Sequence, residues 1–157
     1  MLIDSVFDGC SMAMQALKNL NIRPERYRAS EIDKYCIQVS EKNFKDIKRV
    51  GDIKNFHPGS CKDSILIGGS PCQNLSIAGN RKGLSGEKSS LFFEYLRVLE
   101  EGKYKYFILE NVASMRKTDR DKISKYLGVE PVMIDAALVS AQSRKRLFWA
   151  NFLISQP

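Results

Sequence analysis

Short apolar runs alternate with amphipathic stretches along the chain. The apolar runs are rich in aliphatic and aromatic residues and have the length of strands, whereas the stretches between them carry apolar residues at helical spacing. We expect strands at residues 2–7, 26–30, 47–50, 64–67, 104–109, 132–137 and 146–152. We expect helices at residues 11–20, 34–42, 89–100 and 119–127, and a polar, glycine-bearing loop at residues 70–88.

This alternation of strands and helices predicts an α/β fold with a mostly parallel sheet and helices on both faces. The length of 157 residues fits a single domain, residues 1–157. In such a sheet, ligands bind beyond the carboxyl ends of the strands. Functional residues are therefore expected just after each strand.

Composition narrows the class of protein only a little. Hydrophobic residues make up 43% of the chain and charged residues 27%, which is ordinary for a globular domain. The formal net charge of +7 suits a polyanionic partner, although a merely solvated basic surface gives the same value. No apolar run has the length of a membrane span and no secretory leader is visible, so we expect a cytoplasmic protein without membrane contact.

The cysteines do not form a metal-binding pattern. The chain has Cys10, Cys36, Cys61 and Cys72, none of them at C-x-x-C spacing, and His57 is the single histidine. We therefore expect no metal site, and free thiols in a reducing compartment.

The ends of the first three strands carry groups suited to a nucleoside. A turn with Gly9 follows the first strand and can present backbone N–H groups to a ligand, or can be a simple connection. Glu31 follows the second strand roughly 20 residues later and can accept hydrogen bonds from ribose hydroxyls, or can be a surface glutamate. Asp52 follows the third strand with Ile53 beside it, and can bind an adenine amino group or cap a helix.

The most informative stretch is GGSPCQNLS at residues 68–76, after the fourth strand. Two glycines and a proline restrict the backbone there and project Cys72 from the strand end, where a thiol can be activated as a nucleophile. Glu110 follows the fifth apolar run, and an acid at that place needs a charged or hydrogen-bonding partner or a functional role. The basic segment QSRKR at residues 142–146 precedes the last strand.

Over nearly its whole length the chain resembles the cytosine-C5 DNA methyltransferase family. FDG at residues 7–9 resembles the family's first motif, GGSPCQ at 68–73 its fourth, ENV at 110–112 its sixth and QSRKR at 142–146 its eighth, in the family's order. The stretches RKGL at 81–84, PVMIDA at 131–136 and FWAN at 148–151 are most similar to the family's de novo type.

The resemblance implies a Rossmann-like, S-adenosylmethionine-dependent methyltransferase that acts on a flipped cytosine in DNA. Cys72 is the implied nucleophile, Glu110 binds the edge of the base, and Arg146 and Arg144 hold its O2 atom and the phosphate backbone. The implied cofactor-binding residues are Phe7, Asp8, Gly9, Cys10, Ser11, Glu31, Ile32, Asp52, Ile53, Pro71 and Leu91. The loop at residues 73–88 is expected to close over the base.

Two departures from the family pattern leave alternatives open. Residues 11–13 lack the second glycine usual in the first motif, and the chain stops soon after the eighth motif, before the usual target-recognition region and the last two motifs. We therefore expect a catalytic segment that is cut short or completed by a second subunit, and weak activity of the chain alone. A methyltransferase-like protein without activity and an RNA cytosine-C5 methyltransferase are the alternatives.

Overall fold

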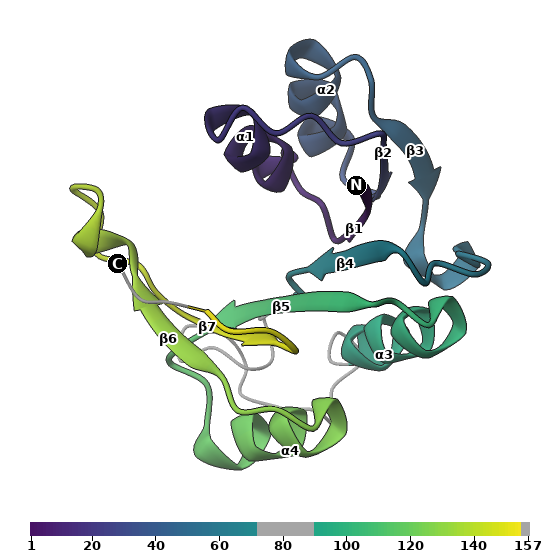
Figure 1. Ribbon diagram of the computed structural model, residues 1–157. Coiled ribbons are helices and arrows are strands. Elements are labelled where there is room, and N and C mark those ends of the chain that lie inside the picture. Colours follow the sequence, from purple (N-terminus) through teal and green to yellow (C-terminus); the bar gives the residue numbers. More distant parts are fainter. Residues whose placement is uncertain (72–89, 155–157) are drawn as a thin grey trace. The chain divides into compact units, whose positions relative to one another are not determined.

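The computed structural model describes residues 1–71 and 90–154 (Figure 1). The chain divides into two compact units, which are described separately. The first unit comprises Met1–Gly69 and Glu94–Phe107, and the second comprises Ser70–Phe93 and Ile108–Pro157.

The first unit contains four parallel strands. They are β1 (Leu2–Val6), β2 (Arg26–Ser30), β3 (Lys48–Gly51) and β4 (Ser64–Gly68), in the spatial order β3-β2-β1-β4. Its helices are α1 (Met12–Asn19), α2 (Lys34–Asn43), the short 3₁₀ helix η1 (Ile53–Asn55) and most of α3 (Ser90–Gly102). The expected parallel sheet is thus confirmed for these strands.

Both faces of this parallel sheet are covered, as the alternation of side chains along the strands requires. On one face Ile3, Tyr27 and Ala29 form a buried cluster against Ala13, Met14 and Leu17, which belong to the α1 segment. On the other face Gly68 of β4 lies against Tyr95 of α3. The absence of a side chain at Gly68 gives this helix its close approach to the sheet.

The second unit is built on antiparallel pairing. Its strands are β5 (Tyr106–Val112), β6 (Val132–Asp135) and β7 (Lys145–Ala150), and β7 pairs antiparallel with both of the others. The helix α4 (Lys117–Leu127) and the 3₁₀ helix η4 (Ala136–Leu138) complete the unit. Its core contains Leu109, Ile123 and Trp149, each with no exposed surface.

The tryptophan of β7 joins strand and helix in this second core. The indole Nε1 of Trp149 donates a hydrogen bond of 3.0 Å to the hydroxyl of Ser124 on α4. The same hydroxyl donates to Glu130 Oε2 at 3.2 Å, after α4 has ended at Gly128, whose φ is 70°. The buried indole of Trp149 and the hydroxyl of Ser124 are thereby hydrogen-bonded, as a stable interior requires.

The expected element boundaries were largely confirmed, with differences at several ends. The seventh strand was expected at residues 146–152 but spans Lys145–Ala150, and the helix expected at residues 119–127 begins at Lys117. The fifth strand was expected at residues 104–109 but spans Tyr106–Val112, so Glu110 and Asn111 lie inside the strand and not after it. Pairing of this stretch with β7 extends the strand, because Glu110, Asn111 and Val112 each have a register partner there. The sixth strand was expected to reach residue 137 but ends at Asp135, whose side chain accepts from the N–H of Ala137 and caps η4.

Candidate cofactor and base site

The carboxyl ends of the four parallel strands lie in one row. Val6 is the register partner of both Ser30 and Gly68, and Ser30 is the partner of Gly51. The residues that follow these strand ends therefore share one edge of the sheet. Sequence reasoning had placed Phe7, Glu31 and Asp52 at this edge, and the register brings them there.

The turn between β1 and α1 has an unusual backbone. Phe7, Gly9 and Ser11 have φ values of 56°, 56° and 60°, and two of these three residues carry side chains that disfavour this region. The N–H of Asp8 continues the strand pairing by donating to Ser30 O at 3.1 Å, and the N–H of Ser11 closes the turn on Asp8 O at 3.0 Å. The turn is therefore specified by contacts around it and not by glycine alone.

Glu31 binds this turn directly. Its Oε2 accepts from the N–H of Gly9 at 2.8 Å, while its Oε1 accepts from the N–H groups of Ile32 and Asp33 at 2.8 and 2.9 Å. A carboxylate has about four acceptor positions, so Glu31 keeps capacity for a ligand hydroxyl. The side chain of Ile32 next to it is 71% exposed and is an apolar surface open to a ligand.

Asp52 and Ile53 follow β3 with different exposures. Asp52 is the N-cap of η1 and accepts from the N–H of Lys54 at 3.0 Å through Oδ1, which leaves its other oxygen able to accept further. Ile53, one of the residues implied at the cofactor site, is only 3% exposed. Its backbone carbonyl accepts from Arg97 Nη2 at 2.6 Å, so Ile53 helps to anchor α3 within the first unit.

Two neighbouring thiols lie close to the β1–α1 turn. Cys10 lies in the β1–α1 turn and Cys36 in the first turn of α2, both half-buried and free. Burial, the hydrogen-bonding neighbour Cys10 and the carboxylates of Asp33 and Glu31 raise the pKa of the Cys36 thiol to about 11. Cys36 is therefore a neutral thiol at physiological pH.

The predicted nucleophile, Cys72, lies outside the described residues, which stop at Pro71 and resume at Ser90. Its immediate lead-in is well defined within the second unit. The side-chain amide of Asn111 on β5 donates to Ser70 Oγ at 3.1 Å and to Ser70 O at 3.3 Å, and both residues are buried. Sequence reasoning did not assign a task to Asn111. Pro71 and Leu91, predicted at the cofactor site, are both half-buried.

Glu110 and Arg146 form an ion pair between adjacent strands. Arg146 Nε donates to Glu110 Oε1 at 2.7 Å, with both side chains partly exposed. The expectation that an acid at this position has a partner is thereby met, and the partner is one of the two arginines predicted for the same site. The register of β5 and β7 brings these two charges together across 36 positions of sequence.

Arg144 and the neighbouring segment line a cavity of about 500 Å³ in the second unit. The cavity wall is formed by Ala113 and Ser114 after β5, by Met133 of β6 and by residues 142–146. The N–H of Arg144 donates to Asp135 Oδ1 at 2.8 Å. Hydrogen bonds from the N–H groups of Ala137 and Arg144 lower the pKa of the Asp135 carboxyl. These two hydrogen bonds also hold the connection between β6 and β7 together.

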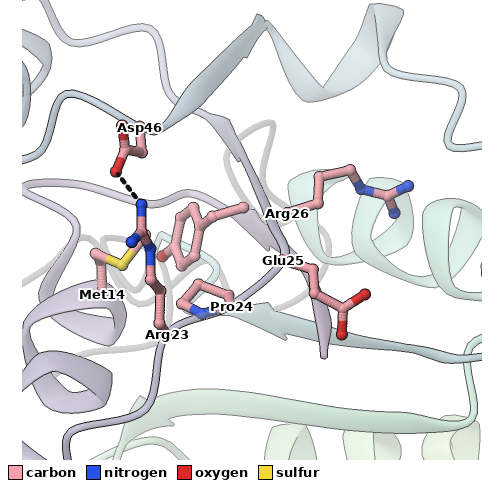
Figure 2. Close-up of a pocket in the computed structure, with 7 residues that line it drawn as sticks. Met14, Arg23, Pro24, Glu25, Arg26 and Asp46 are labelled. Atoms are coloured by element: carbon pink, nitrogen blue, oxygen red, sulfur yellow. Dashed lines mark ion pairs between the residues drawn. The ribbon is translucent and has the colours of Figure 1, made fainter.

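A second cavity, of about 460 Å³, lies at the amino end of β2 (Figure 2). Arg23 and Asp46 point toward one another there and form an exposed ion pair of 3.6 Å (Figure 2). This end of the strand is opposite to the row that carries Glu31. Ligands in parallel sheets bind at the carboxyl ends, so the cavity at Arg23 is not the candidate site.

Among residues 1–71 and 90–154, no cluster of three or more His, Cys, Asp or Glu side chains could hold a metal ion. In the same part of the chain, none of the helices has the length and apolar character needed to span a membrane.

A parallel sheet with helices on both faces and polar groups at its strand ends is typical of the Rossmann-like class of α/β proteins. Within that class the chain belongs to the C-5 cytosine-specific DNA methylase family, whose sequence model matches residues 1–156. The family predicted from the four motifs is thereby confirmed.

Individual relatives agree with this family. The chain is 37% identical to the orphan methyltransferase M.SPRI of Bacillus phage SPR, in a match that covers 74% of this chain and 27% of that protein. It is 33% identical to the type II methyltransferase M.NgoBV of Neisseria gonorrhoeae, over 91% of this chain and 38% of that protein. The chain thus spans between about a quarter and two fifths of the length of these two relatives.

The fold also agrees with a solved structure. A protein described as a DNA modification methyltransferase encoded within an E. coli prophage superposes with a TM-score of 0.73 at 20% identity. The match covers 96% of this chain and 46% of that protein. The predicted Rossmann-like fold class is confirmed by this similarity.

Proposed function

We propose that the protein transfers a methyl group from S-adenosylmethionine to carbon 5 of a cytosine in DNA, with Cys72 as the nucleophile. The observation that carries this proposal is the 2.7 Å ion pair between Glu110 and Arg146. The pair places an acceptor and a multidentate donor side by side, and a cytosine edge offers a complementary amino group and O2 atom. Membership of the methylase family supports the same assignment.

In the proposed reaction, the Cys72 thiolate forms a bond to carbon 6 of the ring. The ring electrons then make carbon 5 nucleophilic, so that carbon 5 would take the methyl group as the bond between that group and the cofactor's sulfonium sulfur breaks, with the electron pair staying on the sulfur of a neutral thioether. Removal of the proton on carbon 5 by a base and departure of the thiolate restore the aromatic ring. Covalent catalysis of this kind divides one difficult step into easier ones.

Glu110 and Arg146 would hold the base during these steps. Glu110 would accept from the amino group of cytosine and share a proton with the ring nitrogen next to it, while Arg146 would donate to O2. Arg144, beside the basic cavity wall, would contact the phosphate backbone of DNA. Because the reacting edge of cytosine is inaccessible in a stacked duplex, the base must be flipped out, which costs a few kcal/mol.

The cofactor would bind at the row of strand ends in the first unit. S-adenosylmethionine supplies a methyl group on a positively charged sulfur. Glu31 would accept from its ribose hydroxyls, Asp52 from the adenine amino group, and Ile32 would pack against the adenine ring. The remaining acceptor capacity of Glu31 and Asp52 and the 71% exposure of Ile32 support this placement.

The direct test is transfer of labelled methyl groups to DNA by the full-length protein and by two variants. Cys72→Ser should abolish transfer, and Glu110→Gln should lower the turnover number by a factor of about 100 or more. Glu100→Gln, a matched change at an exposed glutamate of α3, should leave transfer unchanged.

A second measurement tests the covalent step. DNA containing 5-fluorocytosine cannot lose its substituent after methyl transfer, so the wild-type protein should remain attached to it under denaturing conditions. An adduct that still forms with Cys72→Ser would remove Cys72 from the nucleophile role, and methyl transfer to a position other than carbon 5 of cytosine would overturn the proposed function.

A further inference from the structure

A buried polar network lies beneath the β1–α1 turn and is not used by the proposed reaction. Its members come from the turn, from β2, from α2 and from β3: they are Asp8, Ser11, Tyr27, Ser40 and Arg49. Asp8, Ser11, Tyr27 and Ser40 are each at most 9% exposed, and the side chain of Arg49 is 21% exposed. A buried network of this size must be well satisfied to be stable.

The hydrogen bonds converge on Asp8. Its Oδ1 accepts from the Tyr27 hydroxyl at 2.7 Å, and its Oδ2 accepts from the Ser11 hydroxyl and faces Arg49 Nη1 at 3.5 Å. Because Ser11 donates its only proton to Asp8, the contact between the two serine hydroxyls must be donated by Ser40.

Arg49 closes the network from β3. Its Nη2 donates to the Ser40 hydroxyl, so that donors run in one direction from Arg49 through Ser40 and Ser11 to Asp8. The direction of this series of hydrogen bonds is fixed at both ends, because a guanidinium only donates and a carboxylate only accepts. The network therefore has one self-consistent arrangement.

Tyr27 stays protonated in this setting. Its burial, together with the charge of Asp8 and its hydrogen bond to that carboxylate, raises the pKa of the phenol above its usual range. The hydroxyl is consequently a donor to Asp8 at neutral pH.

The network acts on a turn whose backbone is otherwise unfavourable. Phe7 and Ser11 hold positive φ values that residues with side chains rarely adopt, and such conformations persist only where surrounding contacts enforce them. The side chains of Asp8 and Ser11 are buried and hydrogen-bonded within the network. Their contribution to ligand binding would come through the position of the backbone.

We propose that Tyr27, Ser40 and Arg49 are positioning residues that hold the β1–α1 turn in the conformation that binds the cofactor. This inference rests on the proposed function, which places S-adenosylmethionine at this turn. None of the three residues belongs to a motif of the family quoted above. They act through Asp8 and Ser11, on the same turn whose Gly9 N–H is bound by Glu31.

The test uses the full-length protein and the variants Tyr27→Phe, Ser40→Ala and Arg49→Gln. Binding of S-adenosylhomocysteine, measured by calorimetry, should weaken by about tenfold in Tyr27→Phe and Arg49→Gln and less in Ser40→Ala. The KM for S-adenosylmethionine should rise in parallel, with the turnover number at saturating cofactor kept within about twofold. Arg49→Lys, which retains a charged donor, should recover most of the affinity.

Hydrogen exchange of the ligand-free protein separates positioning from general stability. The amides of residues 8–11 should exchange faster in the three variants, while those of β1 and β4 should exchange as in the wild type. Arg23→Gln and Tyr126→Phe are the matched controls, since both residues are exposed and lie outside the network, and both should behave as the wild type.

The outcomes distinguish this inference from the proposed function. If the wild-type protein binds the cofactor and the three variants bind it equally well, the positioning role is wrong and the proposed function stands. Faster exchange throughout the parallel sheet, or an equal fall in kcat and kcat/KM, would equally overturn the positioning role. If the folded wild-type protein binds no cofactor, the proposed function fails and this inference fails with it.

Discussion

Asp4 is a buried carboxylate at the centre of the first unit, on the face of the sheet opposite to Ile3. It is 1% exposed and binds Arg28, its register partner on β2, through hydrogen bonds of 2.6 Å from Nε and 2.5 Å from Nη2. Tyr104 donates to it at 2.6 Å and the Cys61 thiol lies 3.5 Å away. Burial alone would raise the pKa of Asp4, but the hydrogen bonds from Arg28 and Tyr104 and the charges of Arg28 and Arg26 lower it.

Asp4→Asn should destabilise the protein strongly, because it leaves the Arg28 guanidinium without its counter-charge in the interior. Loss of one partner of such a pair costs about 3–5 kcal/mol. Urea unfolding at neutral pH measures the loss. The matched control Asp46→Asn, at an ion pair whose carboxylate side chain is 83% exposed, should change stability by less than about 0.5 kcal/mol.

The same residue gives the stability a defined pH dependence. Since the pKa of Asp4 is lower in the folded protein than in the unfolded chain, its contribution is complete above the ordinary value of 3.8. The contribution is lost as the pH falls below that value and through the folded-state pKa. The unfolding free energy of Asp4→Asn should therefore fall less steeply between about pH 4 and pH 2 than that of the wild type. Parallel curves for the two proteins would contradict this assignment.

At the scale of elements, β4 and α3 pack closely against one another. A Cβ atom at Gly68 would come within 2.8 Å of Tyr95 Cε2 and 2.9 Å of Val6 Cγ2. Both neighbours are buried and cannot withdraw easily. Gly68 is thus required for the helix to lie on the sheet, in addition to its place in the segment that leads to Cys72.

Gly68→Ala should cost about 1–3 kcal/mol through overpacking. The double variant Gly68→Ala/Val6→Ala should be less destabilised than the sum of the two single variants, because the smaller residue at position 6 removes one of the clashes. Thermal or urea unfolding of all four proteins measures this coupling. Strict additivity would mean that the backbone moves and that the side chains do not clash.

Sequence reasoning identified these elements because strand and helix periods differ and because parallel strands place their ends on one edge. It placed Glu31 and Asp52 at the carboxyl edge of the parallel strands from strand ends alone. The end of β5 could not be read in the same way, because the extension through Glu110 and Asn111 depends on pairing with β7, whose antiparallel direction no local pattern specifies.

The polar network under the β1–α1 turn was missed for a related reason. Tyr27, Ser40 and Arg49 belong to three separate elements, and each by itself has the pattern of an ordinary core or surface residue. Only the register of β2 and β3 and the docking of α2 bring them to Asp8. Likewise, Ile53 is buried and its carbonyl accepts from Arg97 of α3, 44 residues away in sequence.

At the scale of the molecule, the chain consists of two compact units with different sheet architecture. The parallel unit carries the groups proposed to bind the cofactor, and the antiparallel unit carries Glu110, Arg144 and Arg146, proposed to bind the cytosine and its strand. The division therefore separates the residues proposed to bind the cofactor from the residues proposed to bind the cytosine. Each unit has its own fully buried residues, such as Ile3 and Trp149.

The hydrogen bond between the Trp149 indole and Ser124 gives the protein a built-in optical reporter. The chain has one tryptophan, and it is wholly enclosed in the antiparallel unit, whereas the parallel unit has buried tyrosines but no tryptophan. Fluorescence excited selectively at the indole would thus record the melting of one unit only, and circular dichroism would record both. Coincident transitions would demonstrate that the two units unfold cooperatively. Separated transitions would mean that each unit unfolds on its own, so that its stability can be measured separately.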